Sequence, residues 1–288
     1  MTLGALYVGV LIWFHVREDA LLFQPVHGPL AAPPARLHLD SLDVPLTQDG
    51  GGAGPSLVAR VIPPPPEIAS SKVGWILYFH GASGNVSTLG YNEAWSKFRR
   101  LGLGVVAVDY RGYGESTGTP SEAGLYQDAD AAYSYLVNRM HVPPQRVLIY
   151  GYSLGSAVAI DLASRVPAAG LMVEGAFLSI PARGAELYPY LPVGWLAHNR
   201  FASVDKIGRV AMPKLFIHAR QDTIVPIRHG RKLFELAAAP KVLQEVSGGH
   251  VDANQVDPEF FNAIARFVAG LGLPVLFPKT SSGSSPGF

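Results

Sequence analysis

Beyond residue 74 the chain alternates between continuous apolar segments and amphipathic ones, and this alternation restricts the fold more than any other sequence feature. The apolar segments, which we predict to be strands, occupy 74–81, 104–112, 146–153, 170–177, 213–222 and 241–250. The segments that separate them have helical spacing and are predicted helices at 88–102, 119–140, 154–166, 228–239 and 258–271. Such a pattern is typical of a mostly parallel sheet with helices on both faces. We therefore predict an α/β fold with functional side chains at the carboxyl ends of the strands.

Residues 35–62 are predicted to form two further strands, joined by the glycine-rich segment 49–55 and followed by four prolines at 63–66. The helix at 119–140 is expected to begin with a capping box made by Thr119 and Glu122, with Pro120 at its first position. The last helix repeats apolar residues at helical spacing, which we expect in the core: Phe260, Phe261, Ile264, Phe267, Val268 and Leu271.

The composition excludes several classes of protein. A chain of 288 residues with 48% hydrophobic and 16% charged residues fits one large globular domain. Its net charge of +1 comes from scattered basic residues, which argues against a nucleic-acid partner. Cysteine is absent, so disulfides, thiolate metal sites and a cysteine nucleophile are excluded. No metal-binding sequence motif is present, and the sequence indicates neither a metal nor a cofactor.

The N-terminal segment 1–19 contains about 12 uncharged apolar residues from Leu3 to Phe14, short of the roughly 20 that span a bilayer. A tilted or truncated membrane anchor, an atypical signal sequence and a helix packed on the domain all remain open. We expect membrane association through this segment, and otherwise a secreted, periplasmic or cytoplasmic protein. The main domain is predicted at 20–273, with a short cap at 178–212 and a flexible tail at 274–288.

One serine stands at the end of a predicted strand. Gly151, Ser153 and Gly155 match the pattern Gly-x-Ser-x-Gly, with a strand before Ser153 and a helix after it. The tail contains a second match around Ser285, which lacks both flanking elements and is interpreted as flexible chain. We therefore predict that Ser153 is a nucleophile on a sharp strand-to-helix turn.

A serine nucleophile needs a base and an acid that orients the base. Asp222 and His250 also follow predicted strands, and His250 lies behind two glycines that permit a tight loop. Glu174 is the rival acid, but it falls within its predicted strand. The oxyanion is expected to be stabilised by the backbone N–H groups of Leu154 and Ala82.

The segments "FHGASGN", "DYRGYGES", "GYSLGS", "EGAF", "HARQDTIVP" and "SGGH" resemble the α/β-hydrolase superfamily. Within it, the chain is similar to single-domain serine hydrolases with an N-terminal membrane anchor, and "LLFQP" is similar to their post-anchor segment. The resemblance covers about residues 20–272. It implies an α/β-hydrolase fold, with Asp109 and Arg111 holding a loop beside the site. Ala82 replaces an asparagine that is frequent in the family, a change that keeps the backbone N–H but alters substrate preference.

The segment between Phe177 and Pro213 has room for only one or two short helices. Its apolar residues are expected to form an acyl pocket or to pack on the domain; the predicted substrate-binding residues are Tyr152, Leu187, Tyr190 and Trp195. We therefore predict hydrolysis of a small-molecule or lipid carboxylic ester with an apolar part, through an acyl-serine. The alternatives are a thioesterase of the depalmitoylating kind, an amide hydrolase, and a catalytically silent membrane-tethered scaffold.

Overall fold

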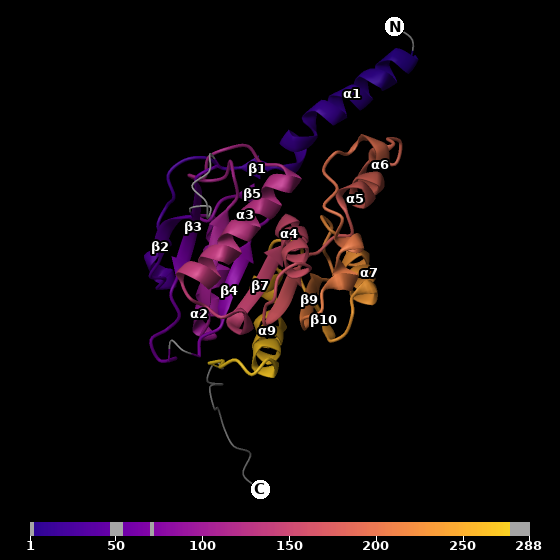
Figure 1. The fold of residues 1–288 in the computed structure, drawn as a ribbon. Coiled ribbons are helices and arrows are strands. Elements are labelled where there is room, and N and C mark those ends of the chain that lie inside the picture. The colour runs from indigo at the N-terminus through magenta and orange to yellow at the C-terminus, as the bar shows by residue number, and fades with distance from the viewer. Residues whose placement is uncertain (1–2, 47–53, 70–71, 277–288) are drawn as a thin grey trace.

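A computed structural model describes residues 3–46, 54–69 and 72–276, and its centre is a large sheet. The strands of this sheet are Leu42–Leu46 (β2), Leu57–Ile62 (β3), Trp75–Phe79 (β4), Gly104–Asp109 (β6), Val147–Tyr152 (β7), Gly170–Glu174 (β8), Lys214–Ala219 (β9) and Lys241–Val246 (β10). In the described part of the chain they form one eight-stranded sheet in the order β10-β9-β8-β7-β4-β6-β3-β2 (Figure 1). Only the pairings of β3 with β2 and with β6 are antiparallel. The sheet is therefore mostly parallel, as predicted.

Helices cover both faces of this sheet. The longer ones are Leu89–Arg100 (α2), Glu122–Ser134 (α3), Leu154–Ala163 (α4), Arg228–Leu236 (α7) and Glu259–Gly270 (α9), and Ala253–Val256 (α8) is a single turn. Successive residues of β4 point to opposite faces: Leu77 joins the core under α3, α4 and α7, whereas Ile76 joins the core under α2 and α9. In α9 the predicted core residues are buried or half-buried, as expected from their spacing. The α/β-hydrolase fold class predicted above is confirmed.

The segment between β8 and β9 forms a small cap. It contains the two short helices Ile180–Leu187 (α5) and Val193–Leu196 (α6), followed by two 3₁₀ turns, Ser203–Asp205 and Ile207–Arg209. One or two short helices were expected here, and two are found. Figure 1 shows α5 and α6 at one end of the molecule, beside the N-terminal helix.

One local prediction was wrong. The N-cap of α3 is Ser121, whose hydroxyl accepts a hydrogen bond from the Gly124 N–H at 3.1 Å, and not Thr119. The carboxylate of Glu122 does not close a capping box, because it accepts hydrogen bonds from the backbone N–H groups of Arg200 and Phe201. At this helix start, the tertiary contacts of Glu122 outweigh the local pattern. The two strands predicted within 35–62 are found as β2 and β3, and they are preceded by a 3₁₀ turn, Ala35–Leu37.

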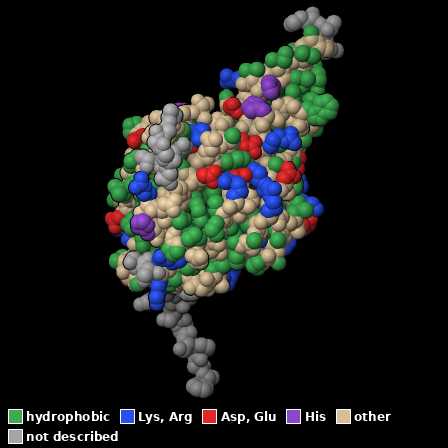
Figure 2. All heavy atoms as spheres, in the orientation of Figure 1, with side chains coloured by type: hydrophobic (Ala, Val, Ile, Leu, Met, Phe, Trp, Pro, Cys, Tyr) green, Lys and Arg blue, Asp and Glu red, His purple; other side chains and the backbone are tan. Residues whose placement is uncertain are grey.

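The N-terminal helix, Leu3–Leu22 (α1), projects from the domain past the cap (Figure 1). Apolar side chains are exposed along it, and Figure 2 shows them in green on the projecting arm. In the described residues, no helix combines the length and the apolar character needed to cross a membrane. Most of the glycine-rich segment 49–55 and of the tail 274–288, with Ser285, lies outside the described residues.

After α1 the chain forms a small second sheet with the loop that follows β4. Gln24–Pro25 (β1) pairs in parallel with Ser83–Gly84 (β5). The Gln24 N–H donates to the Ala82 carbonyl at 2.9 Å, and the Val26 N–H donates to the Gly84 carbonyl at 3.1 Å. The segment after α1 thus fixes the backbone of the loop predicted to bind the oxyanion.

Candidate active site

Ser153 lies on a strained turn between β7 and α4. Its φ and ψ angles are 53° and −118°, a conformation that a residue with a side chain adopts at a cost of about 1–3 kcal/mol. The two flanking glycines permit the close packing of this turn. A Cβ on Gly151 would lie 2.2 Å from the Gly155 carbonyl oxygen, and one on Gly155 would lie 2.1 Å from the Phe79 carbonyl oxygen. The glycine spacing is therefore a steric requirement of the turn that presents Ser153.

Three side chains from three strand ends form one chain of hydrogen bonds. Ser153 Oγ lies 2.8 Å from His250 Nε2, and His250 Nδ1 lies 2.7 Å from Asp222 Oδ2. The other oxygen, Asp222 Oδ1, accepts from the backbone N–H groups of Ile224 at 3.0 Å and Val225 at 2.7 Å. Because a carboxylate only accepts, Nδ1 of His250 carries the proton and Nε2 offers its lone pair to the hydroxyl. The arrangement can remove a proton from Ser153.

The rival acid, Glu174, lies at the end of β8 but is not the partner of His250. Its Oε2 accepts a hydrogen bond from the Tyr150 hydroxyl at 2.6 Å. Burial raises the pKa of Glu174 from 4.5 to about 7, although the Tyr150 hydrogen bond acts in the opposite direction. The carboxyl group is thus partly neutral near pH 7, which reduces the buried negative charge next to the hydrogen-bonded chain.

The other histidines considered from the sequence have structural contacts. His218 Nε2 is 2.7 Å from the Val225 carbonyl and 3.5 Å from Asp222 Oδ2. Burial lowers the pKa of His218, so the ring is neutral and its approach to Asp222 is not a charge pair. His229 is buried beside Glu186, and His80 Nδ1 lies 2.8 Å from the Gly81 carbonyl. None of the three has a hydrogen bond to Ser153 among the described residues.

The resemblance to the superfamily implied that Asp109 and Arg111 hold a loop, and both make such contacts. Asp109 Oδ1 accepts from the Val86 N–H at 2.8 Å, in the loop that follows β4. Arg111 forms two hydrogen bonds to Asp128 Oδ1 on α3, at 3.0 and 2.8 Å. These contacts connect the two loops next to the site with α3.

The backbone groups expected to meet an oxyanion both border the pocket of Ser153. Leu154 is the first residue of α4, and Ala82 follows β4. The Ala82 carbonyl accepts from the Gln24 N–H and, at 2.8 Å, from the Tyr113 hydroxyl, which fixes the orientation of this loop. Among the described residues neither the Leu154 N–H nor the Ala82 N–H has an acceptor. Both donors are therefore free to bind a ligand.

A pocket of about 750 Å³ opens above Ser153 and is lined mainly by apolar side chains. Tyr152 and Leu187 line it, as predicted, and the Tyr152 hydroxyl also donates to the His250 carbonyl at 3.0 Å. Tyr190 and Trp195 are not among its lining residues, because they lie on the outer surface of the cap with 88% and 94% exposure. Their assignment to the pocket was wrong: Trp195 lies in the four-residue helix α6 and Tyr190 in the turn before it, and such short segments are not covered on all sides.

The sequence did not indicate that α1 forms one wall of this pocket. Phe14, Glu18, Leu21 and Leu22 line it from that helix. The Phe14 ring also packs edge-on against Tyr188 of the cap, with centroids 4.8 Å apart. Apolar residues are distributed all around α1, so their spacing in the sequence did not indicate which face is covered.

Comparisons with known proteins show the family to which the chain belongs. Residues 76–286 match the model of the alpha/beta hydrolase family. The chain is 33% identical over 274 residues to the uncharacterized protein Rv2307c of Mycobacterium tuberculosis (strain ATCC 25618 / H37Rv), covering 90% of each. It is 36% identical over 186 residues to the lysophosphatidylserine lipase ABHD12 of Danio rerio, covering 58% of this chain and 48% of that one.

A solved structure, the esterase PF2001 of Pyrococcus furiosus, has the same fold, with a TM-score of 0.69 and 19% identity over 87% of this chain and 98% of that chain. The family match covers well over half of this chain, and the mycobacterial relative matches nearly all of it. The chain therefore belongs to the alpha/beta hydrolase family, and this membership supports hydrolase activity.

Proposed function

We propose that the protein is a serine hydrolase that cleaves carboxylic esters with an apolar acyl or alcohol part. The observation that carries this proposal is the hydrogen-bonded chain Ser153–His250–Asp222 at the base of a mainly apolar pocket. In the first step His250 Nε2 accepts the Ser153 proton while Oγ attacks the ester carbonyl carbon. The Ala82 and Leu154 N–H groups stabilise the oxyanion, each by about 2.7–4 kcal/mol.

The ester C–O bond then breaks, and His250 returns the proton to the leaving alcohol. Water enters, loses a proton to His250 and attacks the acyl-Ser153 carbonyl. Collapse of the second oxyanion releases the carboxylic acid, and the proton returns to Ser153 Oγ. The residues of this site and water account for every proton transferred and every bond formed or broken in both steps.

The pocket favours an uncharged acyl group. Its charged groups already have protein partners: Arg183 donates to the Ile224 and Thr223 carbonyls and to Glu186, and Glu18 accepts from Asn199. A negatively charged acyl group would therefore meet no free cation among the described residues of the lining. The name of the Danio rerio relative, a lysophosphatidylserine lipase, agrees with a lipid ester whose acyl chain enters this pocket.

Labelling with a fluorophosphonate tests the proposal directly. Folded protein should form an adduct on Ser153, located by peptide mass spectrometry, and the adduct should be absent from Ser153→Ala. A folded protein that forms no adduct would contradict the proposed serine hydrolase activity and favour a catalytically silent scaffold.

The same residues also suit thioester or amide cleavage, which is our second candidate reaction. Matched acyl esters, acyl thioesters and acyl amides of equal chain length separate the three reactions. The ester proposal expects the highest kcat/KM for the ester after correction for its uncatalysed rate. A higher corrected value for the thioester would replace the ester with the second candidate.

We also propose that the arm formed by α1 and the outer cap contacts a lipid surface. Trp195 and Tyr190 are almost fully exposed on the cap, and apolar residues of α1 such as Ile12 are exposed beside it. Aromatic side chains of this kind favour the interface between membrane and water. A helix that lies on the surface would bring the pocket next to its lipid substrate.

Flotation with phosphatidylcholine vesicles tests this association. The double variant Trp195→Ala with Tyr190→Ala should lower vesicle partitioning by about tenfold, because two aromatic contacts are lost. The control is Leu42→Ala, an apolar residue with 65% exposure on the edge strand β2, which should not change partitioning. Equal partitioning of both variants and the unmodified chain would contradict the contact.

A further inference from the structure

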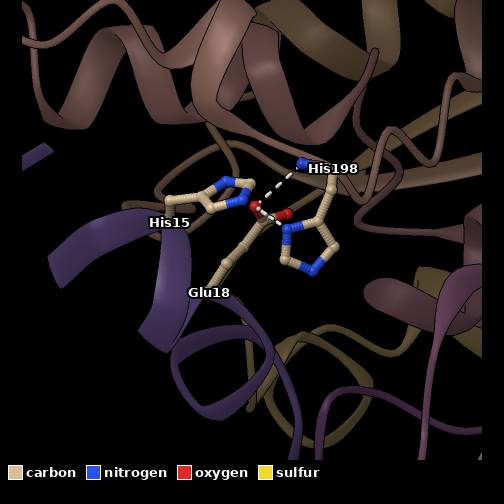
Figure 3. Close-up of side chains that lie close together, drawn as sticks. All are labelled: His15, Glu18 and His198. Atoms are coloured by element: carbon tan, nitrogen blue, oxygen red, sulfur yellow. Dashed lines mark hydrogen bonds and ion pairs between the residues drawn. The ribbon is translucent and has the colours of Figure 1, made fainter. Parts of the chain in front are cut away.

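A cluster of metal-ligating side chains lies where α1 meets the cap, outside the residues that carry the proposed hydrolysis. We propose that His15, Glu18 and His198 bind a divalent transition metal ion of the zinc type, which fastens α1 to the cap. Figure 3 shows the three side chains directed toward one another, two from α1 and one from the loop after α6. The inference does not depend on the reaction proposed above.

The donor set and its spacing suit such an ion. One ligand atom from each residue lies within 4.8 Å of the others. His15 and Glu18 are one helical turn apart and share a face of α1. Ligands at about 2.0–2.1 Å around a tetrahedral ion lie about 3.4 Å from one another, so the widest pair must approach by at most about 1.4 Å. The His198 side chain is 44% exposed, which leaves it room to rotate by this amount.

The groups around the cluster hold both histidines in the orientation that a metal requires. His15 Nδ1 lies 3.0 Å from the Leu196 carbonyl oxygen, which only accepts, so Nδ1 carries the proton and Nε2 keeps its lone pair. His198 Nε2 lies 2.9 Å from Asp19 Oδ1. Metal-binding histidines typically donate their second N–H to a carbonyl or a carboxylate in this way. Both histidines therefore already have the outer contacts of metal ligands.

The third ligand is also fixed by the protein. The Glu18 carboxylate accepts from the backbone N–H groups of His198 and Asn199, each at 2.8 Å. Glu18 Oε2 is also 2.8 Å from His198 Nδ1, and an ion bound between these two atoms replaces the proton that they share. Within the described residues, neither Glu18 nor Asp19 forms an ion pair with lysine or arginine. A divalent cation would balance the two carboxylates.

An ion at this position would also affect the pocket above Ser153. Glu18 lines the pocket together with Phe14 on the same helix, and Leu196 and Ala197 line it from the cap. An ion that joins these two segments would hold one wall of the pocket in place. Imidazole and carboxylate ligands suit Zn²⁺, and Co²⁺ takes the same donors.

The experiment uses the full chain without a polyhistidine tag, after removal of metals with a chelator. Co²⁺ is added as a spectroscopic probe, and Zn²⁺ binding is measured by calorimetry and by thermal unfolding. We expect one ion per chain, visible Co²⁺ absorption bands and a Zn²⁺-dependent rise in Tm. His15→Gln and His198→Gln should each weaken binding by more than tenfold, and Asp19→Asn should weaken it about 10- to 100-fold through the second contact of His198.

The matched control is His141→Asn, an exposed histidine in the left-handed region that asparagine also tolerates. It should bind Co²⁺ and Zn²⁺ like the unmodified chain. Absence of Co²⁺ bands and of a Zn²⁺-dependent Tm shift would overturn the proposal. Binding that survives in both His15→Gln and His198→Gln would overturn it as well, and Tm measured with chelator shows that these variants are folded.

Discussion

The edge of the sheet and the junction between α1 and the cap are both built from residues that are distant in the chain, but they are held differently. At the edge, Ser153 and His250 are 97 positions apart, and each follows the end of a strand of the central sheet. At the junction, Glu18 and His198 are 180 positions apart, and partly exposed side chains join them. Backbone pairing determines the edge, whereas side-chain contacts in reach of solvent determine the junction. We infer that the edge performs the chemistry and that the junction adjusts which substrate fits.

The largest expected effect is at the edge. Replacing Ser153→Ala should lower kcat by about 10⁶, because no other group replaces the attacking oxygen. The measurement is ester hydrolysis under saturating substrate. Ser285→Ala, in the second copy of the same sequence pattern, is the matched control and should keep full activity. Similar losses in both variants would remove the distinction between the two serines.

The second largest effect is expected for the acid at the edge, Asp222. Asp222→Asn keeps the shape of the side chain but no longer favours the His250 tautomer with the proton on Nδ1, and kcat should fall by about 10⁴. Glu174→Gln leaves the hydrogen-bonded chain Ser153–His250–Asp222 intact. The fall in kcat of this variant should therefore be at least about 100-fold smaller than that of Asp222→Asn. A larger loss for Glu174→Gln would make Glu174 the acid instead.

Stability provides a further test at the edge. The pKa of Glu174 is raised from 4.5 to about 7 in the folded protein, so its contribution to stability is full below pH 4.5 and is lost as the pH rises through 7. Glu174→Gln keeps an acceptor for Tyr150 but does not titrate. Relative to this variant, the unmodified protein should lose up to about 3 kcal/mol of unfolding free energy between pH 5 and 8.5. Urea unfolding at both pH values measures the difference; a pH-independent difference would contradict the raised pKa.

A substitution at the junction should change the selectivity for ester chain length and leave the catalytic step intact. Phe14→Ala removes an apolar wall of the pocket and should lower kcat/KM for long-chain p-nitrophenyl esters by about tenfold, with little change for the acetate. Leu6→Ala, exposed near the free end of the same helix, is the control. Equal losses for short and long esters would mean that the junction also acts on the chemistry.

Much of the edge could be predicted because its signals are local. Each predicted strand carries its own apolar run, and parallel strands bring their carboxyl ends to the same side. Ser153, Asp222 and His250 could therefore be selected from their places in the alternation, and the structure brings them into contact. The assignments of Tyr190 and Trp195 to the pocket were wrong because apolar character alone does not say which side of a turn or a short helix is covered.

By itself, the sequence determined the α/β alternation, the order of nucleophile, acid and base, and the glycines that the Ser153 turn requires, since these depend on local spacing and backbone sterics. Only the tertiary structure decided that α1 lines the pocket, that Gln24 holds the loop at Ala82, and that His198 meets His15 and Glu18. These contacts join segments with no shared periodicity. They form because the folded domain places the segments side by side, which no local pattern records.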